Sequence, residues 1–209
     1  PTPNGLKYWL VDVVYDNAAF KLASEVSRWL PQTSAGISRL IAKGIANGRE
    51  VDHSNRIYAC PRLVRFREME YGLPAEDGPA AIREVLDFIK REQIKVHFPI
   101  EYRYVKADDL FISHASGRDS VFISCHMYNK MPYKTYFDGV EEIFARYNGR
   151  PHWGKMHTRQ ADYLHQQYPH LPDFLAQRAK HDPDGVFLTP YLEALLIGER
   201  EPAATAVPA

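Results

Sequence analysis

Two segments of this 209-residue chain carry polar side chains at a spacing that suits catalysis on a sheet. Residues two apart on a β-strand share a face, so Glu101 and Arg103 are expected to point the same way, about 6.5 to 7 Å apart. The same rule groups Ser124 with His126. If the two segments pair, these four side chains form one polar patch. By spacing alone, a solvated strand face with an ion pair worth about 1 kcal/mol or less is the commoner outcome.

A second candidate is the irregular, basic and aromatic segment RPHWGKMH at residues 150–157. His152 and His157 are five apart and no Glu follows His152, so the pattern is not that of a helical zinc site, and we expect no metal. Lys155 stands where partial burial could hold its ammonium against an anionic cofactor or substrate. The alternative is that Trp153 fills a core position while Lys155 extends to solvent.

Composition excludes several function classes. Lys and Arg number 26, and so do Asp and Glu, so no net field attracts nucleic acid, and no phosphate-binding or nucleophile motif is present. Cys60 and Cys125 are too few for a disulfide framework. A single disulfide between them stays an open alternative, and we expect the protein to occupy a reducing compartment. No apolar run reaches the roughly 18 residues of a membrane span, so membrane association is not indicated but stays an open alternative. We expect a cytoplasmic protein whose true N-terminus is missing.

Hydrophobic periodicity indicates which elements position these residues. The order of strands and helices predicts an α+β fold, in which an antiparallel sheet has helices packed on one face and a C-terminal helical segment follows. The strand at 63–71 is expected to end at Gly72-Leu73-Pro74, and residues 197–209 read as a disordered tail. The expected strands are 7–15, 63–71, 96–105 and 120–128, and the expected helices are 20–30, 37–45, 79–89, 136–147, 161–168 and 172–180.

Four ordered motifs resemble the C-terminal half of the aldonolactone oxidase and alditol oxidase branch of the vanillyl-alcohol-oxidase flavoproteins. They are KVHFPIEYRYVKADDLFIS, RDSVFISCHMY, GRPHWGKMHT and YPHLPDFLAQRAKHDPDGVFLTPYLE. The resemblance covers residues 7 to about 195. Its most specific parts are Glu-x-Arg, His-Trp-x-Lys and DPDGVFLTPYLE. The branch includes gulonolactone, galactonolactone and arabinonolactone oxidases and dehydrogenases, which serve ascorbate-type biosynthesis.

The resemblance implies that this chain supplies one part of an enzyme and that the cofactor-binding part is missing from it. Enzymes of this group bind FAD through an N-terminal domain, and nothing here corresponds to it. Residues 1–150 would be the substrate, or cap, domain, and residues 151–196 would contact the flavin domain. The expected partners are therefore an FAD-binding domain or chain of the same enzyme and a small sugar lactone or polyol. The chain alone should have no redox activity.

The resemblance also implies roles for the residues. Glu101 and Arg103 would hold and polarise substrate hydroxyls, and Lys155 would stabilise negative charge on the reduced flavin. His152 and Trp153 would frame the cofactor. The resemblance supports a role less strongly for Glu70, Ser124 and His126, which are all expected to bind substrate. Either His126 or Lys155 would take the hydroxyl proton.

The expected activity is oxidation of a sugar 1,4-lactone of the gulono-, galactono- or arabinono-lactone type, by hydride transfer to flavin N5. An alditol oxidase of the same family is one alternative. A non-catalytic carbohydrate-binding module that has lost its flavin domain is another. Flavin absorption bands in the purified protein separate the enzyme from the binding module.

Overall fold

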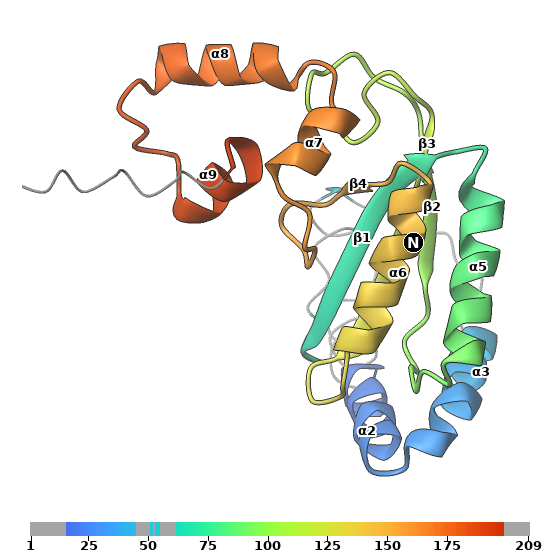
Figure 1. The fold of residues 1–209 in the computed structure, drawn as a ribbon. Helices are drawn as coiled ribbons and strands as arrows, with labels where there is room; N and C mark the ends of the chain where they lie inside the picture. Colours follow the sequence, from blue (N-terminus) through green and yellow to red (C-terminus); the bar gives the residue numbers. More distant parts are fainter. Residues whose placement is uncertain (1–15, 45–50, 52, 55–61, 199–209) are drawn as a thin grey trace, which may run out of the picture. The chain divides into compact units, whose positions relative to one another are not determined.

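The computed structural model describes residues 16–44, 51, 53–54 and 62–198 and confirms the expected α+β class. Four strands form one antiparallel sheet in the order β2-β3-β1-β4 (Figure 1). The strands are β1 (Phe66–Pro74), β2 (Glu101–Val105), β3 (Ser120–Tyr128) and β4 (Arg150–Pro151). The helices are α2 (Asp16–Trp29), the short η2 (Pro31–Thr33), α3 (Ser34–Gly44), α5 (Gly78–Arg91), α6 (Lys134–Arg146), α7 (Ala161–Gln167), α8 (Leu171–His181) and α9 (Pro190–Leu196). The strand expected at 7–15, Cys60 and residues 199–209 of the tail lie outside the described residues.

Three strand bounds differ from expectation. Strand β1 continues through Gly72, where an added Cβ would lie 3.3 Å from the Phe122 ring, so the glycine permits close packing rather than a break. Pro74 stands at the end of the strand, where its missing N–H is tolerated. Strand β2 begins only at Glu101, after Pro99. Strand β4 was not expected, because two residues carry no periodicity.

The chain divides into two compact units whose boundary runs through the long elements. Among the described residues, unit 1 comprises 16–68, 85–101 and 124–140, and unit 2 comprises 69–84, 102–123 and 141–198. In unit 1, Gly139 of α6 allows close approach of Phe88 of α5, since an added Cβ would lie 2.1 Å from that ring. The buried Cys125 on β3 is a free thiol, and burial raises its pKa to about 12.

The core of unit 2 has two parts. Tyr71 of β1 packs against Phe144 of α6 with ring centroids 5.4 Å apart. Helices α7, α8 and α9 share a separate apolar cluster around Leu164, Tyr168 and Leu195. These helices form the C-terminal helical segment that the sequence analysis expected, although α9 was not among the expected helices. None of the described helices has the length and hydropathy needed to cross a bilayer.

A buried imidazole in unit 1 makes stability depend on pH. The His97 ring is fully buried against Phe20 and Phe98, and its Nε2 lies 3.0 Å from the Ser24 hydroxyl. Burial lowers the pKa of His97 from 6.5 to about 4. The folded state therefore binds fewer protons than the unfolded state between these values. The free energy of unfolding should therefore be highest above pH 6.5. It should decline as the pH falls towards 4, by at most about 1.4 kcal/mol per pH unit.

Urea unfolding of the full chain at several pH values between 4 and 7.5 tests this. We expect His97→Gln, which removes the titrating group and keeps a polar one, to flatten the decline. His181→Gln, at an exposed position at the end of α8, should keep the parental profile. A decline of equal slope in all three proteins would contradict the assignment to His97.

Candidate functional site

The strands that carry the predicted site residues are neighbours in the sheet. Glu101 and Arg103 lie on β2, Ser124 and His126 on the adjacent β3, and Glu70 on β1 (Figure 1). The two polar segments therefore pair, which is the condition that the sequence analysis set for a shared polar patch. The expectation of a solvated face is wrong for β3, because Ser124 and His126 are both buried. Buried polar side chains need specific partners, and these partners define the site.

In unit 2, one buried carboxylate gathers two cations from distant segments. Glu70 is 4% exposed, and its Oε2 accepts hydrogen bonds from Arg103 Nη2 at 2.5 Å and from Lys155 Nζ at 2.9 Å. The Lys155 side chain is 19% exposed and that of Arg103 is 53% exposed. The sequence ranked Glu70 as a weaker candidate, whereas it lies at the centre of the cluster. We call Glu70, Arg103 and Lys155 the Glu70 cluster.

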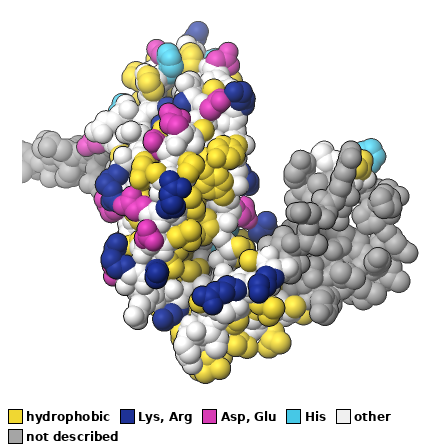
Figure 2. Space-filling view, turned by 90° about the vertical axis from the view of Figure 1, so that its right-hand side faces the viewer, with side chains coloured by type: hydrophobic (Ala, Val, Ile, Leu, Met, Phe, Trp, Pro, Cys, Tyr) yellow, Lys and Arg dark blue, Asp and Glu magenta, His cyan; other side chains and the backbone are white. Residues whose placement is uncertain are grey.

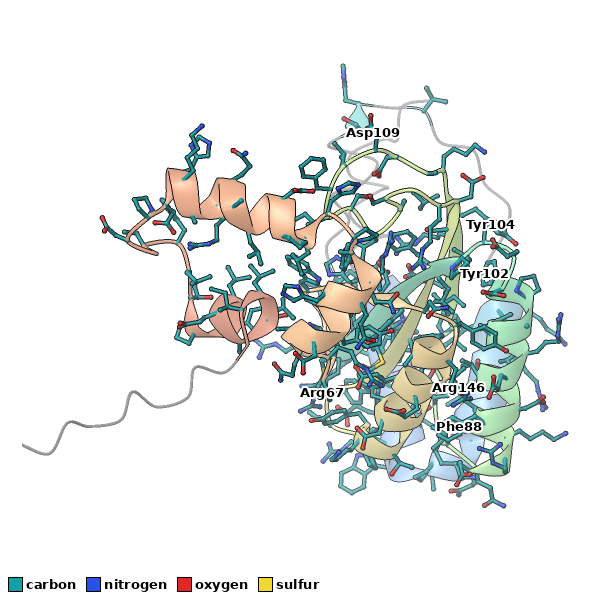
Figure 3. The ribbon with its side chains drawn as sticks, turned by 45° about the horizontal axis from the view of Figure 1, so that its top comes forward. Arg67, Phe88, Tyr102, Tyr104, Asp109 and Arg146 are labelled. Carbon is teal, nitrogen blue, oxygen red and sulfur yellow. The ribbon has the colours of Figure 1, made fainter. Side chains whose placement is uncertain are left out.

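The alternation of side chains along β2 determines the direction of the Arg103 side chain. Tyr102 and Tyr104 lie on the other face of the strand, where their rings meet edge to face at 5.3 Å and their hydroxyls lie 3.2 Å apart (Figure 3). The Cβ that alanine would add at Gly78 would lie 2.4 Å from the Tyr102 hydroxyl. This packing on one face leaves Arg103 directed to the opposite one.

Lys155 is positioned by a turn that follows β4. The His152 N–H donates to the Glu70 carbonyl at 2.9 Å and so extends the pairing of β4 with β1. The Gly154 N–H donates to His152 Nδ1 at 3.1 Å, and the Lys155 N–H donates to the His152 carbonyl at 3.0 Å. The His152 ring therefore accepts a hydrogen bond within the turn to which it belongs. This turn brings the ammonium of Lys155 to the carboxylate of Glu70.

Glu141, which the sequence analysis missed, holds the C-terminal end of the segment that carries Lys155. Glu141 of α6 is 2% exposed and accepts hydrogen bonds from the Tyr71 hydroxyl at 2.5 Å, the Thr158 N–H at 2.8 Å and the Thr158 hydroxyl at 2.5 Å. Burial, together with the Glu141 carboxylate, raises the pKa of Tyr71 well above its ordinary value, so the phenol remains a donor. The available signal was an acidic residue on the apolar stripe of a predicted helix, between Phe137 and Phe144.

Arg150 of β4 is another unpredicted support. It is 5% exposed, and its guanidinium donates to the carbonyl oxygens of Ser116 at 2.8 Å, Gln167 at 3.0 Å and His114 at 3.1 Å. It also lies 4.9 Å from the centre of the Tyr168 ring. The guanidinium therefore joins β4 to the 113–116 loop and to α7, and it fixes the start of the Lys155 segment.

Trp153 packs against the apolar cluster of α7 to α9, with its ring 6.2 Å from that of Tyr168. Its carbonyl accepts a hydrogen bond from the Tyr191 hydroxyl at 2.6 Å. This matches the core-filling alternative for Trp153. Contact of His152 or Trp153 with a cofactor stays a prediction.

In unit 1, an imidazole is placed against two carboxylates. The side chain of His126 is 4% exposed, and its Nε2 lies 3.2 Å from Glu68 Oε1 and 3.9 Å from Glu101 Oε1. Its ring stacks on Phe98 at 5.9 Å and meets Phe66 edge to face at 5.2 Å. Glu68 was not among the residues predicted for the site. The two carboxylates and the two aromatic rings therefore fix the position of the imidazole.

Comparisons with known proteins agree on one family. A family model described as D-arabinono-1,4-lactone oxidase matches residues 1–195. L-gulono-1,4-lactone dehydrogenase of Mycobacterium tuberculosis is 38% identical over 196 residues, which cover 94% of this chain and 45% of that protein. L-gulonolactone oxidase of Scyliorhinus torazame is 31% identical, over 80% of this chain and 40% of that protein. Alditol oxidase of Streptomyces is 31% identical, over 63% and 32% respectively. This chain thus spans less than half the length of these relatives.

Proposed function

The chain belongs to the D-arabinono-1,4-lactone oxidase family, and we propose that it is the C-terminal, substrate-binding half of an FAD-dependent enzyme that oxidises a sugar 1,4-lactone. The names of three relatives support an oxidoreductase, and two of them specify a gulonolactone. The observation that carries the proposal is the Glu70 cluster. It fixes a guanidinium and an ammonium side by side on a buried carboxylate, as a site for oxygen-rich ligands requires.

The donor set of the Glu70 cluster fits a flavin. Lys155 donates to Glu70, and its partly exposed ammonium can also donate to an anionic or carbonyl acceptor. Such acceptors lie along the N1 and C2 edge of an isoalloxazine ring. When bound, the flavin supplies the hydride acceptor. Lys155 is proposed to bind this edge and to stabilise the negative charge that develops there.

The remaining roles concern the substrate. Arg103 is proposed to donate hydrogen bonds to the lactone oxygens, while the Glu101 carboxylate accepts from a hydroxyl and orients the carbon that is oxidised. The hydroxyl proton is assigned to Nε2 of His126, because Lys155 already donates to Glu70. Glu68 and Glu101 face that nitrogen and would hold the ring in position. Ser124 is proposed to bind the substrate, and Glu70 to position both cations.

The full-length enzyme that contains this chain tests the proposal. We expect the purified protein to show flavin absorption bands that bleach when L-gulono-1,4-lactone is added without oxygen. An alditol such as xylitol, tested in parallel, distinguishes the alditol oxidase alternative, which the similarity to the Streptomyces enzyme favours. A colourless protein that releases no flavin on denaturation would contradict the proposal and favour the carbohydrate-binding module.

Lys155→Met provides a test of the cofactor role, because it keeps an unbranched stem and removes the charge. We expect anaerobic flavin reduction by the lactone to slow by about tenfold to a hundredfold, with a more negative flavin midpoint potential, since one stabilising cation is lost. Lys106→Met is the matched control, because Lys106 is 88% exposed and pairs only at the surface with Asp119. An unchanged potential in Lys155→Met would refute the role of Lys155 at the flavin.

A further inference from the structure

Unit 1 contains a cavity that the flavin and substrate roles do not use. It has a volume of about 480 Å³, and its lining comes from the end of α2, from residues 92–95 after α5 and from residues 130–136 at the start of α6. All of these segments belong to unit 1, and they meet at the lower end of the sheet in Figure 1. A cavity of this volume is within the range that holds small-molecule ligands.

The charged groups of this cavity are mostly cationic. Its described lining includes one carboxylate, that of Glu92, and four cations: Arg28, Lys95, Lys130 and Lys134. Glu92 is itself paired with Arg91. Glu25 and Asp138, which lie outside the lining, accept hydrogen bonds from three of the four cations at 2.6–3.1 Å. Lys95 makes no ion pair with a described residue. The cavity therefore keeps an excess of positive charge, which suits an anionic ligand.

The inner wall of the cavity is apolar and aromatic. Met131 is 5% exposed and Tyr136 is 1% exposed, and both line it together with the partly buried Tyr133. The Tyr133 ring meets Phe137 edge to face at 5.6 Å, and the Arg67 guanidinium lies 4.5 Å from its centre. These contacts fix the ring. Figure 2 shows Lys and Arg beside hydrophobic side chains at the lower end of the molecule. The cavity therefore suits a ligand with a planar apolar body and an anionic end.

The start of α6 adds hydrogen-bond donors to the cationic side chains. This helix has 13 residues, and its first turn contains no acidic residue. The Tyr133 carbonyl accepts from the Phe137 N–H at 2.9 Å, so Tyr133 occupies the N-cap position. Tyrosine has no short side-chain oxygen that can cap the first N–H groups. Phosphate oxygens are suitable acceptors for such groups, and the residues that carry them line the cavity.

We propose that this cavity binds a nucleoside monophosphate. The phosphate would lie between the four cations and the start of α6, and the base would pack against Tyr133. A phosphate is favoured over a carboxylate, because several cations and a helix start together exceed what a single negative charge requires. A planar base is favoured over an aliphatic group, because the wall presents aromatic rings. The proposal does not depend on the flavin chemistry.

Isothermal titration calorimetry of the full-length protein that contains this chain tests the proposal. We expect adenosine monophosphate to bind at least about tenfold more tightly than adenosine or inorganic phosphate, since each of these lacks one half of the ligand. Lys95→Gln, Lys134→Gln removes two exposed cations of the lining and should weaken binding by about tenfold or more. Glu92→Gln removes the lining carboxylate and should strengthen binding by about twofold or more, a gain that unfolding cannot produce.

Lys106→Gln, Lys180→Gln is the matched control, because it removes two exposed cations from unit 2. It should bind adenosine monophosphate like the parent. Tyr133→Leu keeps an apolar side chain but loses the ring, so it should weaken the binding of adenosine monophosphate and leave that of inorganic phosphate unchanged. Equal affinities of the parent and the Lys95, Lys134 variant would overturn the proposal, since the nucleotide would then bind elsewhere. So would equal affinities of the parent for adenosine monophosphate and inorganic phosphate, or no binding of the nucleotide.

Discussion

Replacing Arg103 with alanine is expected to lower kcat of the flavin-loaded, full-length enzyme by about a hundredfold or more. The reason is electrostatic: the guanidinium is fixed on the buried Glu70 by a 2.5 Å hydrogen bond and more than half of its side chain stays accessible to a ligand. A preorganised donor of this kind contributes about 3 kcal/mol to transition-state stabilisation. Steady-state kinetics with L-gulono-1,4-lactone measure the effect.

Two further variants separate this role from a structural one. Arg103→Lys keeps the charge but loses the planar fork, so its loss should lie between that of alanine and the parent. Arg91→Ala removes a guanidinium that is 66% exposed and bonded to the adjacent Glu92, and it should leave kcat unchanged. If Arg103→Ala stays within a few-fold of the parent, Arg103 is only a surface charge.

The second large effect is expected from Glu141→Ala. The buried hydroxyl of Tyr71 and two donors of the exposed Thr158 lose their buried acceptor, and Arg159 loses a carboxylate 3.9 Å away. Leaving such groups unsatisfied should lower the free energy of unfolding by about 3–5 kcal/mol. Because Thr158 ends the segment that carries Lys155, kcat should fall as well. Urea unfolding and steady-state kinetics of the same protein measure both effects.

Glu142 offers a control one residue away. Its side chain is 67% exposed, and it holds Arg159 at 2.6 Å on the surface. Glu142→Ala should therefore change the free energy of unfolding by about 1 kcal/mol or less. Glu141→Gln keeps the shape and one acceptor oxygen, so it should fall between the two. Equal stability losses for Glu141→Ala and Glu142→Ala would contradict the anchoring role of Glu141.

Local patterns predicted the kind of element correctly for the long described segments, although the bounds of β1 and β2 differ from the prediction. The segment 120–128 was expected as a strand and is β3 with the same bounds, and the helices α5 and α6 lie where the apolar spacing predicts them. The sequence also determined that Glu101 and Arg103 share a strand face, and its ordered motifs indicated the family that the comparisons confirm. Period and motif are local properties, so a single sequence contains them.

Only the tertiary structure decided which faces of the strands and helices contact one another. Glu70 is 33 residues from Arg103 and 85 from Lys155, so no periodicity could pair them. The two-residue β4 that brings Lys155 to Glu70 is too short to leave a pattern, and Glu141 gains its importance only from the loop that folds onto it. Likewise, the amphipathic spacing of α2 predicts a helix, but the burial of Ser24 and Ser27 instead of Leu22 depends on what packs beside it. Spacing defines the face of an element, whereas long-range contacts decide whether that face meets solvent, core or charge.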